Sequence, residues 1–229
     1  MIRLVVMLAI LLGLVIGPHL WVQRVFARHR TERPDFPGTG GELARHLLDR
    51  FNLSHVKIET TPTGDHYDPL TKTVRLTPDN YRGKSLTAVT VAAHEVGHAL
   101  QDAAGYPPLA ERTRLVRLAQ RAEQIGAYMM LGIPILAVVT RTPAAGGLML
   151  LAGLATMSLA TLVHLITLPV EWDASFRRAL PVLERGGYLS RRDLNSARRI
   201  LTAAALTYVA GSMMSLLNLW RWITLLRRA

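Results

Sequence analysis

The stretch VAAHEVGHALQ, residues 91–101, decides the fold, because it lies at the centre of a predicted helix. Ser85 is a suitable N-cap before it, and Gly105, followed by two prolines, ends it. The helix is therefore predicted over 85–104. Apolar residues recur along it at steps of three and four, which predicts one buried face.

His94 and His98 lie four residues apart, so their side chains project from the same side of this helix. Neutral imidazole suits Zn²⁺, and a catalytic zinc site keeps one position for water beside three protein ligands. Glu95, next to the first histidine, is placed to act as general base toward that water. The spacing predicts one Zn²⁺ per chain; the alternative is two surface histidines on an amphipathic helix.

The third zinc ligand has to come from elsewhere, and Glu171 is the best candidate. It ends a long uncharged run that is able to carry it toward the motif helix. His164, seven residues earlier, is a weaker rival. Asp173 is predicted to support a ligand histidine, since such histidines donate their other N–H to a carboxylate or carbonyl. The alternative for Asp173 is an ion pair with Arg177.

Four runs without Asp, Glu, Lys or Arg cover residues 4–23, 124–140, 142–170 and 200–220. About 20 apolar residues in a helix span a bilayer, so these runs predict about four transmembrane helices. The alternative for the first run is a signal peptide, but its apolar stretch is too long for one and no clean cleavage site follows.

The chain of 229 residues has a formal charge of +11 and no cysteine. The absence of cysteine excludes disulfides and thiolate metal sites. Arginines cluster directly beside the uncharged runs, where positive charge marks the cytoplasmic side of a membrane and favours anionic lipid. This distribution predicts membrane lipid, and no nucleic acid, as a partner.

A Pro/Gly-rich linker covers 31–41, and apolar residues at helical spacing predict a short helix over 42–52. Alternating residues around Val56 and Val74 predict two short strands, antiparallel to each other.

Four segments resemble the neutral zinc metallopeptidases of bacterial membranes, the YugP-like group. They are DHYDPLTKTVRLTPDNY at 65–81, VAAHEVGHALQDAAGYPPLAER at 91–112, LPVEWDASFRRAL at 168–180 and AALTYVAG at 204–211. The resemblance implies zinc on His94, His98 and Glu171, with Glu95 as catalytic acid and base. The chain is more distantly similar to HtpX-type membrane proteases, which also place two membrane helices between the HExxH helix and a downstream glutamate ligand. That group has an acidic residue where this chain has Ser175.

The expected fold is mainly α with a small β-sheet: about four transmembrane helices and a zincin-like cytoplasmic metalloprotease domain. The expected segments are an N-terminal transmembrane helix (1–27), the catalytic part with the HExxH helix (28–123), two transmembrane helices (124–170), a cytoplasmic segment with the third ligand (171–199), and a C-terminal transmembrane helix with a basic tail (200–229). This layout predicts an integral membrane protein whose active site faces the cytoplasm, and the resemblance implies that the membrane is the bacterial inner membrane.

The expected activity is zinc-dependent endopeptidase cleavage of membrane or membrane-proximal proteins, with a protein or peptide as substrate. In zincin-like folds the strand before the motif helix is an exposed edge, so 73–77 is expected to pair with the substrate. Four side chains are candidates for stabilising the oxyanion: His66, Tyr67, Tyr106 and Arg178. The alternative is a catalytically inactive metal-binding membrane scaffold. A transporter is disfavoured, because the uncharged runs hold few ionisable residues.

Overall fold

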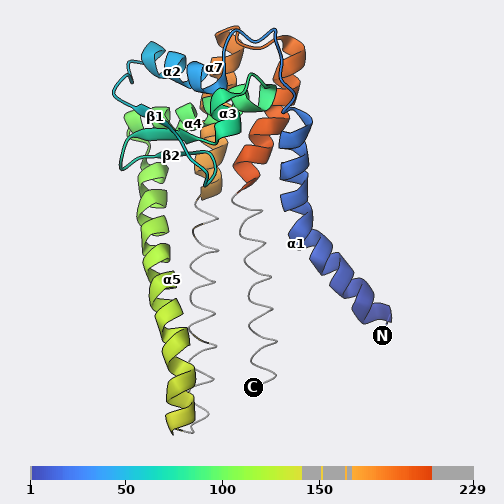
Figure 1. Cartoon of the computed structure of the whole chain (residues 1–229), viewed down its shortest axis with the longest axis vertical. Helices are drawn as coiled ribbons and strands as arrows, with labels where there is room; N and C mark the ends of the chain where they lie inside the picture. The colour runs from blue at the N-terminus through green and yellow to red at the C-terminus, as the bar shows by residue number, and fades with distance from the viewer. Residues whose placement is uncertain (1, 141–150, 152–162, 164–166, 208–229) are drawn as a thin grey trace.

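The computed structural model describes residues 2–140, 151, 163 and 167–207. The chain is mainly helical with one small sheet, and the sheet and the short helices gather at one end, from which α1 and α5 extend (Figure 1). The elements are α1 (Ile2–Arg28), α2 (Gly40–Arg50), β1 (Lys57–Thr60), β2 (His66–Asp68), β3 (Thr73–Leu76), α3 (Pro78–Arg82), α4 (Leu86–Ala103), α5 (Pro107–Thr140), the π-helix η1 (Asp173–Ala179) and α7 (Leu180–Arg185). Residues 167–172 and 191–207 are also helical.

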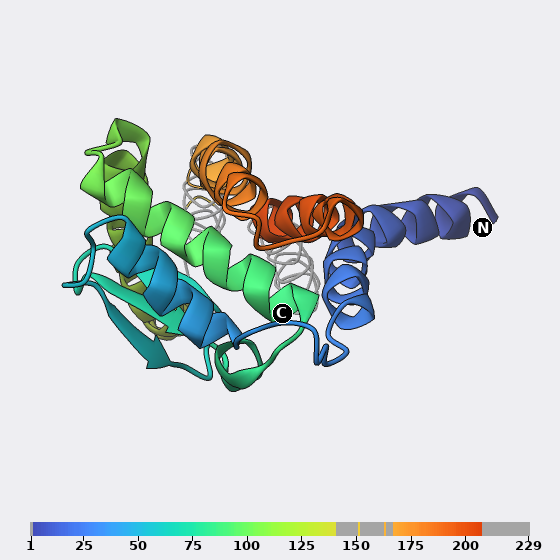
Figure 2. The ribbon, with the colours of Figure 1, turned by 90° about the horizontal axis from the view of Figure 1, so that it is seen from above.

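Helix α4 carries the histidine motif and lies at the centre of the domain. Ser85 caps its first turn by accepting a hydrogen bond from the Ala88 N–H, as predicted, and Gly105 follows it with φ +61°. Figure 2 shows α4 between α2 and the helices of residues 167–207. Fifteen of its 18 residues are buried, so the expectation of one buried face is wrong. Alanines and one glycine let neighbours approach from several sides, and a helix covered all round has no solvent face.

The sheet has three strands in the order β1-β3-β2. β1 pairs with β3 in parallel, so the prediction of an antiparallel pair is wrong. The reason lies in the intervening loop, which contributes β2. This strand forms an antiparallel hairpin with β3, so the chain reverses direction twice between β1 and β3 and these two strands run the same way. β3 is therefore the central strand, and the expectation that 73–77 forms an exposed edge is also wrong.

The prediction of about four transmembrane helices is wrong for the described part of the chain, where no helix combines the length and apolar character needed to cross a bilayer. The run at 124–140 forms the C-terminal half of α5, whose first half carries several charged residues. The run at 4–23 falls in α1, whose last turns pack on the domain, where Val22 is buried against Ala203. The runs at 142–170 and 200–220 lie largely outside the described residues.

Candidate metal centre

His94 and His98 lie side by side at the buried centre of α4. Their ring centroids are 4.8 Å apart, and the two residues are 3% and 4% exposed. Both Nε2 atoms point at the same carboxylate oxygen: Glu171 Oε2 lies 3.1 Å from Nε2 of His94 and 3.2 Å from Nε2 of His98. The structure thus brings together the three predicted metal ligands. Glu171 is 77 residues from His94 and 73 residues from His98 in the sequence.

Glu171 reaches the histidines because its helix approaches α4 very closely. A Cβ built on Gly97 would lie only 2.7 Å from the Ala174 carbonyl oxygen. The glycine between the two histidines therefore allows backbone-to-backbone contact with η1. A π-helical turn is uncommon and is frequent at functional sites, and here η1 begins two residues after Glu171. It places Asp173 and Ser175 in the buried layer around the histidines.

Gln101 fixes the proton of His98. Its side-chain N–H group donates to the Val170 carbonyl at 2.8 Å and to Asp173 Oδ2 at 2.9 Å. Since both partners only accept, the amide oxygen is the atom 2.9 Å from His98 Nδ1. His98 therefore donates from Nδ1. The sequence predicted this supporting role for Asp173. Asp173 instead accepts a hydrogen bond from Gln101, which contacts His98 directly. No local sequence pattern indicated a role for Gln101.

Ser175 fixes the proton of His94 in the same way. Its Oγ lies 3.1 Å from His94 Nδ1 and 3.3 Å from the Leu201 carbonyl oxygen. The carbonyl can only accept, so the hydroxyl donates to it and receives the Nδ1–H of His94. Ser175 therefore supports the first histidine without adding a charge.

With Nδ1 already protonated on both rings, each Nε2 can hydrogen-bond to Glu171 only if both imidazoles are charged. Two buried cations with centroids 4.8 Å apart repel each other strongly. A single divalent ion replaces the two protons and satisfies all three atoms. Ligands about 2.0–2.1 Å from a tetrahedral zinc lie about 3.3 Å apart, close to the two His–Glu separations of 3.1 and 3.2 Å, and all three ligand atoms lie within 4.8 Å of one another. The donor set therefore fits zinc.

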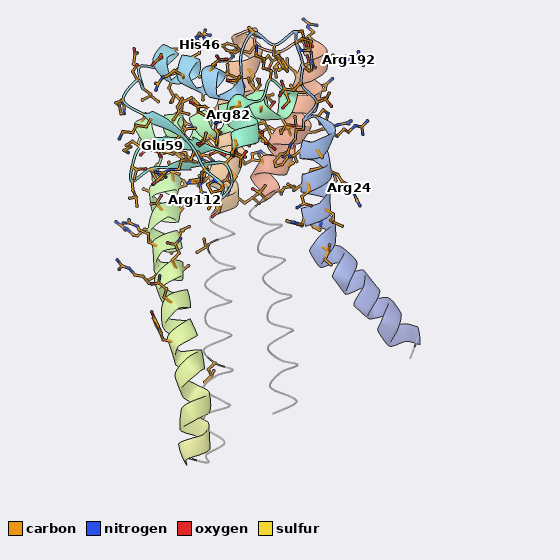
Figure 3. The ribbon with its side chains drawn as sticks, in the orientation of Figure 1. Arg24, His46, Glu59, Arg82, Arg112 and Arg192 are labelled. Carbon is orange, nitrogen blue, oxygen red and sulfur yellow. The ribbon has the colours of Figure 1, made fainter. Side chains whose placement is uncertain are left out.

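Glu171 is held as a carboxylate. Burial alone would raise its pKa, but His98, the contacts with both imidazoles and Arg112 outweigh that effect and hold the pKa well below its usual range. Glu171 Oε1 makes no hydrogen bond within the described part of the chain, although Arg112 Nη1 lies 3.1 Å away in an ion pair. Arg112 belongs to the first turns of α5 (Figure 3) and was missed, because it was grouped with the other arginines of that segment.

Asp173 makes its ion pair with Arg178 rather than with Arg177. Arg178 Nε donates to Asp173 at 2.8 Å, and Nη1 donates to the Leu100 carbonyl at 2.9 Å. The guanidinium lies 5.8 Å from the centre of the Tyr106 ring. Arg178 and Tyr106 therefore support the layer behind the histidines, and neither lines the cavity described below. His164 lies outside the described residues.

A cavity of about 390 Å³ opens beside the three ligands. Glu95 and Arg112 line it together with the segment Gly64–Tyr67, so His66 and Tyr67 remain beside the site. Tyr67 donates its hydroxyl to Asp102 Oδ2 at 2.6 Å, while His66 Nδ1 donates to the Gly64 carbonyl at 2.9 Å.

Glu95 is only 5% exposed, and it lines the same cavity as the two histidines. Burial raises the pKa of Glu95 to about 8, against the effect of His94, and the charges of Asp65 and Glu171 raise it further. A divalent cation nearby would act in the opposite direction. A buried carboxyl group whose pKa is set by these opposing effects is suited to accept and return a proton.

Comparison with known proteins agrees with this geometry. Residues 4–227 match the family described as "Putative neutral zinc metallopeptidase". The chain is 35% identical over 215 residues to the "Putative membrane protease YugP" of Bacillus subtilis (strain 168), covering 93% of this chain and 91% of that protein. No solved structure matches the chain. Since the family match spans nearly the whole sequence around a buried His-His-Glu centre, the chain belongs to the neutral zinc metallopeptidase family.

Proposed function

We propose that the protein is a zinc-dependent endopeptidase that cleaves membrane or membrane-proximal proteins, with zinc on His94, His98 and Glu171 and with Glu95 as general base. One observation carries the proposal: three buried acceptor atoms converge beside a cavity that also contains a buried carboxyl group. Within the described residues this is the one group of three or more metal-ligating side chains close enough to share an ion.

Bound zinc supplies Lewis-acid polarisation of the scissile carbonyl and activation of a water molecule. Glu95 accepts a proton from the attacking water as the C–O bond forms, and it then passes this proton to the leaving nitrogen as the C–N bond breaks. Its burial excludes bulk water from this proton transfer. Gln101 and Ser175 hold the Nδ1 atoms of both imidazoles, so that both Nε2 lone pairs would be available to the ion.

The main chain of the substrate is proposed to pair with β2. β2 is an edge strand in the observed order, and the residues at its start line the cavity. Addition of an extended peptide to a sheet edge gives main-chain hydrogen bonds with little dependence on sequence. The proposal thus moves the substrate strand from 73–77, which is central, to the neighbouring hairpin strand.

Membrane association is part of the proposal. It is supported by the printed name of the relative from Bacillus subtilis and by exposed tryptophans, Trp21 at 41% and Trp172 at 49%. Tryptophan is enriched where protein meets the membrane–water interface, and arginines such as Arg24 and Arg117 attract anionic lipid. Cosedimentation with anionic and with neutral phospholipid vesicles tests this part, and equal failure to bind both would contradict it.

The decisive experiment for the activity is Glu95→Gln. The variant keeps the metal ligands, so it should bind one zinc per chain with unchanged affinity. Its hydrolysis of peptide substrates should fall by about 10²–10⁴-fold, the usual contribution of a general base. If neither the zinc-loaded wild type nor the variant hydrolyses any peptide, the protein is instead a metal-binding scaffold. If both cleave at the same rate, Glu95 is not the base.

A further inference from the structure

Part of the cavity beside the metal centre is apolar, and the proposed hydrolytic chemistry does not use it. Phe26 comes from α1, Val91 from α4, and Ala204 and Thr207 from the helical residues 191–207. These four side chains come from three parts of the chain that are far apart in sequence. The polar lining, in contrast, comes from the metal ligands, Glu95, Arg112 and the segment before β2.

This apolar wall is built into the domain and is not a loose surface. The Phe26 carbonyl accepts a hydrogen bond from Thr87 Oγ1 at 2.9 Å, and the Thr87 N–H donates to the His29 carbonyl at 3.2 Å. The end of α1 is therefore fastened to the first turn of α4. Val22 is buried against Ala203, so α1 also packs on the helix that supplies Ala204.

The wall begins one helical turn from the reacting groups. Val91 precedes His94 by three residues and Glu95 by four, so all three share one face of α4. An apolar group in contact with Val91 thus lies within a turn of the ion and of the base. A substrate residue that flanks the scissile bond, or the residue next to it, would place its side chain there.

We propose that Phe26, Val91 and Ala204 form a subsite for one large apolar side chain of the substrate, of the Leu, Met or Phe class, beside the scissile bond. This inference rests on the proposed peptidase function and names its substrate class. A cavity of about 390 Å³ is at the small end of the range for ligand sites, which suits one side chain and the adjoining main chain. Ala204 leaves the space that the side chain occupies.

The test uses the full-length, zinc-loaded protein and fluorogenic peptides that differ only at one residue on either side of the scissile bond. That residue is Ala, Leu, Phe or Asp. We expect kcat/KM to be about tenfold or more higher for Leu or Phe than for Ala at one of these positions, since one missing methylene already costs about tenfold or more. Asp at that position should be cleaved least.

Two substitutions change the subsite in opposite directions. Ala204→Leu fills it and should lower the Phe-to-Ala ratio of kcat/KM by about tenfold or more. Phe26→Ala widens it and should shift the preference from Leu toward a peptide with Trp at the same position. Matched controls away from the cavity are Ala110→Leu on α5 and Phe51→Ala, where Phe51 is 38% exposed; both should keep the wild-type ratios. Zinc content, measured by atomic absorption, reports on folding in every variant.

The outcomes separate the two levels of the proposal. If the zinc-loaded wild type cleaves no peptide of the series, the peptidase function is wrong and the subsite with it. If cleavage occurs at equal rates across the series, or if both cavity variants keep the wild-type ratios, the subsite alone is wrong. Opposite shifts in the two variants, with zinc bound in both, support the subsite and exclude general destabilisation as the cause. Should Ala204→Leu lose its zinc, Phe26→Ala still decides the matter.

Discussion

Replacing Gln101 by Leu should weaken zinc binding although residue 101 never touches the ion. The change is nearly isosteric, and Gln101 is fully buried, so the main loss is polar. The His98 Nδ1–H and the Val170 carbonyl lose their partners at 2.9 and 2.8 Å, whereas Asp173 keeps Arg178. A buried polar group without a partner costs about 1–3 kcal/mol, so two of them should lower the free energy of unfolding by about 3 kcal/mol.

The same substitution should lower zinc affinity about 10–100-fold, because the partner of a ligand histidine sets its tautomer and orientation. Competition with a chromophoric chelator measures this affinity without any substrate, and nitrogen NMR of the imidazoles reports the protonated ring atom. Gln101→Glu separates the two effects. Its carboxylate still accepts from His98 but faces Asp173 and the Val170 carbonyl, so stability should fall while the His98 tautomer is kept. Gln120→Leu, at an exposed position of α5, is the matched control.

The reasoning would be refuted by a Gln101→Leu protein that binds zinc within twofold of the wild type and keeps its proton on His98 Nδ1. That result would mean that the tautomer is set by the metal alone.

Three further outcomes are expected. Gly97→Ala should destabilise the fold by about 1–3 kcal/mol and lower zinc affinity, because its Cβ would lie 2.7 Å from the Ala174 carbonyl oxygen. Thermal unfolding with and without zinc checks this, and an unchanged melting temperature of the zinc-free protein would contradict it. Removing zinc with a chelator should lower the melting temperature reversibly, since free zinc at 100 times its Kd stabilises by about 2.7 kcal/mol; a melting temperature insensitive to zinc would argue against the site. Partial burial raises the pKa of Asp68, but hydrogen bonds from Arg75 and Thr71 outweigh it and lower the pKa to about 2. The carboxylate therefore stabilises the fold by about 2 kcal/mol above pH 4, and this contribution is lost as the pH falls toward 2. Denaturant unfolding of the wild type and Asp68→Asn from pH 7 to 2 measures it: the two curves should converge at low pH, and a constant difference would exclude this origin.

The local pattern around residues 85–105 determined the helix, its cap at Ser85 and its end at Gly105, because capping and backbone conformation depend on neighbours in sequence. It also placed His94 and His98 on one side of the helix. Glu171 followed from the chemistry of a site that lacked a third ligand. Each of these inferences needed only the helical repeat or the donor requirements of zinc.

Tertiary structure alone decided the rest. The parallel pairing of β1 with β3 and the edge position of β2 depend on how a loop returns to the sheet. The hydrogen bonds that Gln101 donates to Val170 and Asp173, and the apolar wall that Phe26 shares with Ala204, join segments 69 residues or more apart. Uncharged runs were read as membrane spans, yet part of α1 is used in packing. Such contacts depend on which distant surfaces meet. A periodic pattern indicates that a residue is buried, but it does not indicate which residues pack against it.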